Sequence, residues 1–288
     1  MSTKFSTVKI TPLLIKIVVY NTIMETIKLK KGLGQNLLID KNQIRKIIAS
    51  IDLNSKDTVI EIGPGLGAIT LEMAKIAKNI ICIEKDPEMV SALNQKLTEG
   101  GIKNVKIVST DILRLFINDK LNIPELKEYK IVANIPYYLT SILIRNLLEI
   151  KNLPKDIFLM IQKEVGQRIC AKPGNMSILS IAVQYYANPK ILFTVSKGCF
   201  YPSPKIDSVF IRITPKEIKK NAEYFKLIKA GFAHPRKQLI GNLFSQLKIE
   251  REITKKWLED NGLKPGERAE VLSLPQWESL FTLLKGKA

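Results

Sequence analysis

The sequence contains very little histidine and cysteine. Its single histidine, His234, rules out mechanisms that need two imidazoles and leaves no pair from which a zinc site could be built. The three cysteines, Cys82, Cys170 and Cys199, are scattered without a C-x-x-C pair. This pattern indicates reduced thiols in an intracellular protein. We therefore expect a cytoplasmic protein that holds no metal.

The sequence also lacks a long uninterrupted apolar run. Its most apolar stretch, residues 8–24, carries two lysines and is too short for a transmembrane helix. No small-x-small cleavage motif follows, and the stretch has no arginine, so neither a secretory signal nor an organellar presequence is indicated. We interpret residues 1–30 as an N-terminal extension, with Met24 as the functional start, and we expect no membrane partner.

Acidic residues are few compared with basic ones. Lys and Arg number 45 and Asp and Glu 27, which gives a formal net charge of +18. A large charge of one sign indicates a polyanionic partner, and nucleic acid is the first candidate. A lysine-rich proteome in which most proteins are basic is the alternative, so the charge alone does not decide.

Apolar segments with strand and helix character alternate along the first two thirds of the chain. Strands are expected over residues 58–63, 79–86, 105–111, 129–136 and 156–162, and helices over 41–51, 68–77, 87–97, 141–150 and 163–170. This alternation predicts a parallel sheet with helices on both faces. After Pro215 only helical patterns appear, over 221–247, 250–263 and 274–286. The predicted fold is α/β, a Rossmann-like sheet domain (31–215) followed by a small all-helical domain (216–288).

Three glycines stand where the first predicted strand turns into a helix. They are Gly63, Gly65 and Gly67 in "EIGPGLGAIT", and their backbone N–H groups can approach a ligand closely. A dinucleotide site would show G-x-G-x-x-G, whereas this loop reads G-x-G-x-G and is preceded by Glu61. It resembles the S-adenosylmethionine loop of class I methyltransferases, where a carboxylate suits a cationic sulfonium. A tight turn without a ligand is the alternative.

Two acidic residues end the next predicted strands. Glu84 lies about twenty residues beyond the glycines, the spacing expected of an acid that binds ribose hydroxyls. Asp111 ends the third strand, where its carboxylate can accept a hydrogen bond from an adenine amino group. Either residue alone is commonly a helix cap. Their common position at carboxyl ends of strands predicts a nucleoside cofactor.

The fourth predicted strand ends in "VANIPYY". Asn and Pro can simply form a turn, but the amide and the aromatic rings also suit a nucleobase. The N6 nitrogen of adenine is a poor nucleophile because its lone pair is delocalised into the ring. The side-chain oxygen of Asn134 and the carbonyl of Ile135 can accept from its N–H groups, while Tyr137 stacks on the ring. No strong base is needed, because the sulfonium leaves as a neutral thioether.

Six motifs in order extend this pattern: "KGLGQNLLID", "EIGPGLGAIT", "NIPYYLTSIL", "MIQKEVGQRI", "FYPSPKIDSVFIRI" and "FAHPRKQLIGNL". The set is similar to the small-subunit rRNA adenine N6,N6-dimethyltransferase family. The resemblance implies S-adenosyl-L-methionine as cofactor and dimethylation of two adjacent adenosines in the 3′-terminal hairpin of 16S rRNA. The implied partner is the immature 30S subunit, in ribosome biogenesis, and nothing demands more than a monomer.

The resemblance also assigns residues by position. The cofactor set it implies is Asn36, Leu38, Gly63, Gly65, Glu84, Asp111 and Asn134. Phe200 would form the second wall of an adenine sandwich opposite Tyr137. The RNA contacts expected from basic residues are Lys163, Arg168, Lys205, Arg236 and Lys237, for which a solvated surface is the alternative.

The sequence departs from the family pattern at three positions. Leu33 and Leu37 stand where the family typically has Phe, and Pro235 stands where a basic or polar residue is frequent. Two alternative functions remain open. One is a 23S rRNA adenine methylase of the macrolide-resistance type, and segment 267–280 favours the small-subunit family over it. The other is a non-catalytic nucleic-acid-binding factor on the same fold, against which the intact Glu84, Asp111 and Asn134 argue.

Overall fold

The computed structural model describes residues 35–117, 128–134 and 136–286. By its contacts the chain divides into two units, Met1–Gln35 and Asn36–Ala288, and every element named below belongs to the second. The predicted extension (1–30), its start at Met24, Leu33 and Ile135 lie outside the described residues. In the part of the chain that is described, no helix is both long and apolar enough to cross a membrane.

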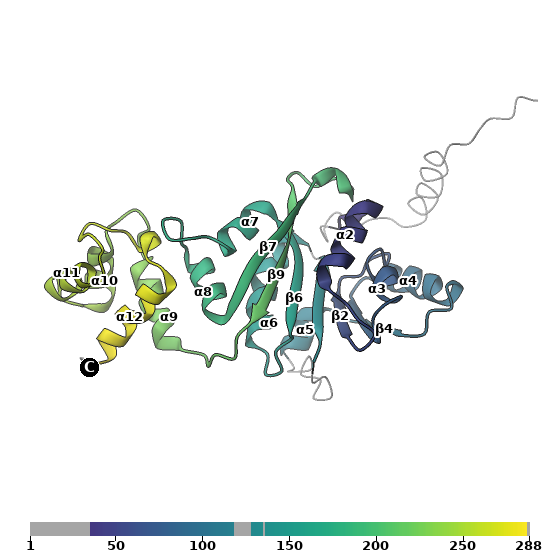
Figure 1. Cartoon of the computed structure of the whole chain (residues 1–288), viewed down its shortest axis with the longest axis horizontal. Coiled ribbons are helices and arrows are strands. Elements are labelled where there is room, and N and C mark those ends of the chain that lie inside the picture. The colour runs from purple at the N-terminus through teal and green to yellow at the C-terminus, as the bar shows by residue number, and fades with distance from the viewer. Residues whose placement is uncertain (1–34, 118–127, 135, 287–288) are drawn as a thin grey trace, which may run out of the picture. The chain divides into compact units, whose positions relative to one another are not determined.

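A seven-stranded sheet in the order β4-β3-β2-β5-β6-β9-β7 forms the centre of this unit (Figure 1). Its strands are β2 (Thr58–Ile62), β3 (Asn79–Glu84), β4 (Val105–Ser109), β5 (Lys130–Asn134), β6 (Asp156–Gln162), β7 (Ala187–Val195) and β9 (Ser208–Pro215). Strands β4, β3, β2, β5 and β6 run parallel, which confirms the predicted fold class. The prediction missed β7 and β9, which extend the sheet with antiparallel pairs.

Helices cover both faces of the sheet. They are α2 (Lys41–Ile51), α3 (Thr70–Met73), α4 (Pro87–Glu99), α5 (Ile112–Ile117), α6 (Thr140–Glu149), α7 (Lys163–Ile169) and α8 (Ile178–Tyr186). Because successive strand residues point to opposite faces, β5 contributes to two cores. Ile131 and Ala133 pack in the core that contains α6, and Val132 packs in the core that contains α2. The predicted cap of α2 is present, since the Asp40 carboxylate accepts from the Gln43 N–H at 2.8 Å.

One predicted helix is much shorter than expected. The pattern over 68–77 forms a regular α-helix only at Thr70–Met73. The chain then continues in turns, where the Ile76 N–H donates to the Met73 carbonyl, and the Lys78 N–H reaches the Asp57 carbonyl. These bonds turn the chain back into β3 before a longer helix can form.

After β9 the described chain contains helices and no strand. They are α9 (Ala222–Gly231), α10 (Leu239–Leu247), α11 (Arg251–Asp260) and α12 (Leu274–Lys285). They surround a third core with the buried rings of Trp257 and Trp277 at its centre. The single helix predicted over 221–247 is two helices, since a turn containing Pro235 separates α9 from α10. Ile181 of α8 also packs into this core, and the domain boundary near Pro215 stays a prediction.

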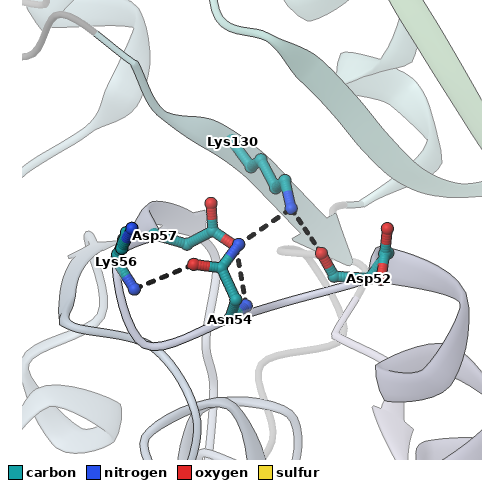
Figure 2. A network of polar contacts seen from close by, with 5 residues as sticks. All are labelled: Asp52, Asn54, Lys56, Asp57 and Lys130. Carbon is teal, nitrogen blue, oxygen red and sulfur yellow. Dashed lines mark hydrogen bonds and ion pairs between the residues drawn. The ribbon is translucent and has the colours of Figure 1, made fainter.

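A buried lysine, Lys130, lies at the end of the sheet where the parallel strands begin (Figure 2). Lys130 is 5% exposed, and its Nζ donates to the Asp52 carbonyl at 2.6 Å and the Asp57 carboxylate at 3.0 Å. The same Asp57 oxygen accepts from the backbone N–H and the side-chain amide of Asn54. This network ties the end of α2 and the following loop to the first residue of β5.

Candidate active site at the carboxyl edge of the sheet

The strand order reverses between β2 and β5, and the predicted site residues lie at this position. From β2 the chain proceeds through β3 to β4 on one side, and β5 then pairs on the other side. Ligands of open α/β sheets bind at the carboxyl ends of the strands next to such a reversal. The register pairs Ile62 with both Ile83 and Ala133, so the residues that follow, Glu84 and Asn134, flank Gly63. With strands ~4.8 Å apart, the three backbones span about 10 Å.

The glycine loop has a backbone that requires glycine. Gly63, Gly65 and Gly67 have φ values of 71°, 54° and 81°, in the left-handed region that other residues rarely adopt. A Cβ on Gly67 would lie 2.5 Å from a Leu93 methyl of α4. The ammonium of Lys96, also on α4, donates to the Leu66 carbonyl at 3.0 Å. Sequence patterns did not indicate a role for Lys96. Its hydrogen bond to Leu66 stabilises the glycine loop.

Glu84 is held by the backbone around it. It is 9% exposed, and its Oε1 accepts from the N–H groups of Lys85 and Asp86 at 2.9 Å. Its Oε2 accepts from the Gly65 N–H at 3.3 Å, which joins the carboxylate to the glycine loop. A carboxylate offers about four acceptor positions, so Glu84 retains capacity for a ligand hydroxyl.

Asp111 lies between β4 and α5. Its Oδ1 accepts from the Leu113 N–H at 3.0 Å, as a helix cap does, and its Oδ2 lies 3.5 Å from the Lys85 ammonium. The carboxylate therefore has a structural role in this arrangement. Its role toward adenine stays a prediction.

Asn134 ends β5 with its amide in a defined orientation. Its Nδ2 donates to the Asn36 carbonyl at 3.3 Å. The amide oxygen takes no part in this bond. Asn36, which the resemblance assigns to the cofactor site, is thus also the hydrogen-bond partner of the Asn134 amide. Sequence spacing could not indicate a contact between residues so far apart in the chain.

Tyr137 follows Asn134 in a short 3₁₀ helix, η2 (Tyr137–Leu139). Its hydroxyl shares a 2.8 Å hydrogen bond with the hydroxyl of Ser208, which is fully buried at the start of β9. Burial raises the pKa of the Tyr137 phenol above its ordinary value, and the hydrogen bond with Ser208 offsets only part of this rise. The neighbouring Tyr138 is 61% exposed and lies outside the core. Sequence reasoning did not identify Ser208 as the partner of Tyr137.

Phe200 and Leu38 face each other across a small two-stranded sheet. It consists of β1 (Leu37–Leu38) and β8 (Phe200–Tyr201). Leu38 is 5% and Phe200 4% exposed, and both pack in the core that contains α2. Leu37 lies against the glycine loop, where a Cβ on Gly65 would be 3.2 Å from its methyl. The base-stacking role of Phe200 stays a prediction, and its ring is largely covered in this structure.

The predicted RNA contacts lie in two places, and all five side chains are exposed. Lys163 and Arg168 lie on α7, and the Lys163 N–H donates to the Asp207 carbonyl at 3.1 Å. That bond places α7 beside the 204–208 loop, which carries Lys205. Arg236 and Lys237 lie in the turn between α9 and α10.

A buried acid lies beneath the glycine loop. Glu61 is 3% exposed, and its Oε2 accepts from the Thr70 hydroxyl at 2.6 Å and lies 3.7 Å from the Cys82 thiol. Burial raises the pKa of Glu61 to about 7, against the lowering effect of the Thr70 and Cys82 hydrogen bonds. Burial also raises the pKa of the Cys82 thiol, as does the nearby Glu61 charge.

The Glu61 pKa predicts a pH-dependent stability. The folded state retains a proton that the unfolded chain releases near pH 4.5, so the free energy of unfolding falls as pH rises from about 4.5 to about 7. The loss is on the order of 2 kcal/mol. Glu61→Gln removes this titration, so the variant should gain about 2 kcal/mol over the parent between pH 5 and pH 8. Urea unfolding at both pH values measures it, with the exposed Glu72→Gln as control; equal pH dependence in Glu61→Gln and the parent would contradict the assignment.

Comparisons with known proteins agree over nearly the whole chain. The sequence profile of the family described as "Ribosomal RNA adenine dimethylase" matches residues 26–285. A protein named "Ribosomal RNA small subunit methyltransferase A" from Dehalococcoides mccartyi is 40% identical over 262 residues, 88% of each chain. The protein of that name from Staphylococcus carnosus is 36% identical over 269 residues, 89% of this chain and 90% of its own.

Two solved structures resemble this fold closely. A dimethyladenosine transferase from Plasmodium falciparum is 27% identical with a TM-score of 0.71, over 87% of this chain and 97% of that one. The 23S rRNA methyltransferase ErmE is 25% identical with a TM-score of 0.71, over 87% of this chain and 100% of that one. The family match over residues 26–285 includes the sheet, the carboxyl-edge site and the C-terminal helices.

Proposed function

The chain belongs to the ribosomal RNA adenine dimethylase family, and from that premise we propose how its carboxyl-edge site works. The protein is an S-adenosylmethionine-dependent methyltransferase that dimethylates adenine in small-subunit rRNA. The finer assignment is to two adjacent adenosines in the 3′-terminal hairpin of 16S rRNA. We further propose that it acts in the cytoplasm, as a monomer away from membranes, on the immature 30S subunit.

The residues at the carboxyl edge fit the cofactor. Three glycines in left-handed conformations leave room for a ligand, and Glu84 is a fixed carboxylate with acceptor capacity for a ribose diol. When bound there, S-adenosylmethionine supplies an electrophilic methyl group on a cationic sulfonium. Gly63, Gly65, Glu84 and Asp111 would hold it, while Leu38 of β1 and the preceding Asn36 would line the site. Nearby carboxylates favour this positive charge.

Asn134 would make the adenine amine reactive. Its side-chain nitrogen donates to the Asn36 carbonyl, so its oxygen is available to accept from the amine. Accepting a hydrogen bond from N6 draws the nitrogen toward tetrahedral geometry and localises its lone pair for attack. The Ile135 carbonyl is the second proposed acceptor, and Tyr137 and Phe200 would hold the ring from its two faces. The N6–methyl bond would form as the sulfur–methyl bond breaks, the sulfur would leave as a neutral thioether, and the methylated nitrogen, acidic while cationic, would release its proton to water. Positioning and electrostatics would then suffice without a strong base.

The orientation of Asn134 next to Gly63, at the reversal of strand order, carries this proposal. The test is mass mapping of methylated rRNA after incubation of the recombinant protein with immature 30S and with 50S particles. We expect dimethyladenosine in 3′-end fragments of 16S rRNA and none in 23S rRNA. Methylation of 23S rRNA alone would instead support the activity that ErmE is named for.

Ser208 is proposed as a positioning residue for Tyr137. Removing its hydroxyl frees the Tyr137 phenol, so Ser208→Ala should lower kcat/KM for RNA by about five- to tenfold, the value of one hydrogen bond. Tyr137→Phe should cause a similar loss. Because both variants break the same bond, the double variant should lose little more than either one. Single-turnover methylation of all four proteins measures this coupling.

The control for this cycle is Ser50→Ala, which removes a hydroxyl near the end of α2 that donates to the Ile47 carbonyl. It should leave methylation unchanged and combine additively with Tyr137→Phe. The affinity for S-adenosylmethionine should be equal in all variants, which separates ring positioning from a general loss of structure. Additive losses in the Ser208–Tyr137 cycle would remove Ser208 from the mechanism.

A further inference from the structure

A pocket of about 320 Å³ lies away from the carboxyl-edge site. It is formed where the end of α7, the start of β7, the end of β9 and the start of α12 come together. β9 begins at Ser208, beside Tyr137, and ends at Pro215, next to Lys216 of the pocket. Eight strand residues at ~3.4 Å each place the pocket roughly 25 Å from the carboxyl edge. It therefore cannot belong to the site where methyl transfer is proposed.

The polar groups of this pocket are cationic or neutral. Lys172 and Lys216 line it together with Asn188, and the described lining residues include no acid. Lys172 is exposed, whereas Lys216 is half-buried and its Nζ donates to the Gln184 carbonyl at 2.8 Å. An ammonium has three N–H donors, so this bond fixes Lys216 without exhausting it. Two ammonium groups and an amide in one concavity suit a phosphate.

The remaining walls are apolar. Ala187, Pro189 and Leu274 contribute surface without charge, and Cys170 adds a thiol. A concave site with apolar walls and a few convergent polar groups is typical of small-molecule binding, and its volume is within the usual range of roughly 300–1,000 Å³. Apolar walls beside two cations match a nucleotide, whose base is flat and weakly polar and whose phosphate is anionic.

The pocket is held in shape by the fold. The Gln184 side chain donates to the carbonyls of Ile169 and Ala171 at 2.9 and 2.8 Å, which fixes the end of α7 against α8. The N–H groups of Gly174 and Met176 both donate to the Glu270 carbonyl, which ties the next segment to the C-terminal helices. The lysines thus project from a preformed surface.

We propose that this pocket is a second RNA contact, which holds one unpaired, phosphate-bearing nucleotide of the rRNA substrate. The proposal rests on the proposed function, since it takes rRNA as the ligand. Recognition of RNA favours unpaired nucleotides whose bases can leave the helix. A contact about 25 Å from the reacting adenine would orient the rRNA without touching the methyl transfer.

The first test is a charge reversal at the pocket rim. Lys172→Glu should raise the Kd for 3′-terminal 16S rRNA in immature 30S particles by about five- to tenfold. It should also reduce the slope of log K against log salt by about 1. The matched control is Lys103→Glu, an exposed lysine before β4 at the other side of the sheet. Equal effects of the two variants would overturn the proposal.

Calorimetry with S-adenosylmethionine should give the same affinity for the parent, Lys172→Glu and Lys103→Glu. A parent that methylates 16S rRNA while Lys172→Glu behaves as the control would refute the pocket alone. A parent that methylates no rRNA would refute the proposed function instead. The two failures are therefore distinguishable.

The second test uses the unaltered chain and its own thiol. Cys170 lines the pocket and is partly accessible, whereas Cys82 is buried. Bound RNA should slow alkylation of Cys170 at least about fivefold, as read by peptide mass spectrometry, and S-adenosylmethionine alone should not. Adenosine monophosphate tests whether a free nucleotide, rather than one within the rRNA, occupies the pocket. Protection by RNA, with or without protection by the mononucleotide, supports the proposal; protection by the mononucleotide alone, or by neither, overturns it.

Discussion

Asn134→Ala is expected to lower the rate of methyl transfer by about 10²–10³-fold while RNA affinity stays nearly intact. The variant removes the oxygen that would accept from the adenine amine, and a preorganised acceptor of this kind is worth roughly 3–4 kcal/mol in the transition state. It also removes the amide nitrogen that donates to the Asn36 carbonyl at 3.3 Å. Single-turnover methylation of immature 30S particles measures the rate, and filter binding of the same particles measures affinity.

Asn146→Ala is the matched control for this substitution. The Asn146 amide lies on the exposed side of α6 and donates to the Ile142 carbonyl of its own helix. Its loss should leave methylation unchanged. Asn134→Asp adds a second comparison, because it keeps an acceptor oxygen but places a charged oxygen against the Asn36 carbonyl. We expect its rate to lie between those of the parent and Asn134→Ala. Full activity in Asn134→Ala would remove Asn134 from the proposed chemistry.

The positions of the candidate site residues could be predicted because they follow from short-range patterns. Glycines after a strand, an acid at the end of the next strand and an amide at the end of a later one are each visible within a few residues. Parallel strands bring their carboxyl ends to one edge, so the pattern alone placed Gly63, Glu84 and Asn134 together. The register of β2 with its two neighbours confirms that arrangement.

The contacts that orient these side chains could not be predicted in the same way. Asn134 meets Asn36 across 98 positions, and Tyr137 meets Ser208 across 71. Neither contact produces a periodic pattern in the sequence, because each joins segments that meet only in the folded structure. Strand β9 was also missed, although Pro202 and Pro204 in its motif both precede the strand.

Lys130 shows the same limit at the opposite edge of the sheet, and it carries the largest expected effect on stability. A lysine at the start of a strand is usually solvated, yet its side chain here is 7% exposed and bonded to a carboxylate that is 16% exposed. Lys130→Met keeps the apolar stem but leaves the Asp57 charge largely buried without its cation. Such a loss costs about 3 kcal/mol, which is near the lower end of values for buried pairs because Asp57 retains some access to water.

Urea unfolding of Lys130→Met, Asp57→Asn and the double variant tests this expectation. The double variant should be more stable than the sum of the single losses predicts, since removing the carboxylate charge as well leaves none unpaired. Lys75→Met is the control. Lys75, in the turn after α3, forms an exposed ion pair with Glu72 of α3, and this pair should contribute under about 1 kcal/mol to the free energy of unfolding. Additive single losses would contradict a coupled pair. Lys130 and Asn134 begin and end the same five-residue strand, so the buried ammonium at one end anchors the strand that carries, at its other end, the amide proposed to accept from the adenine amine.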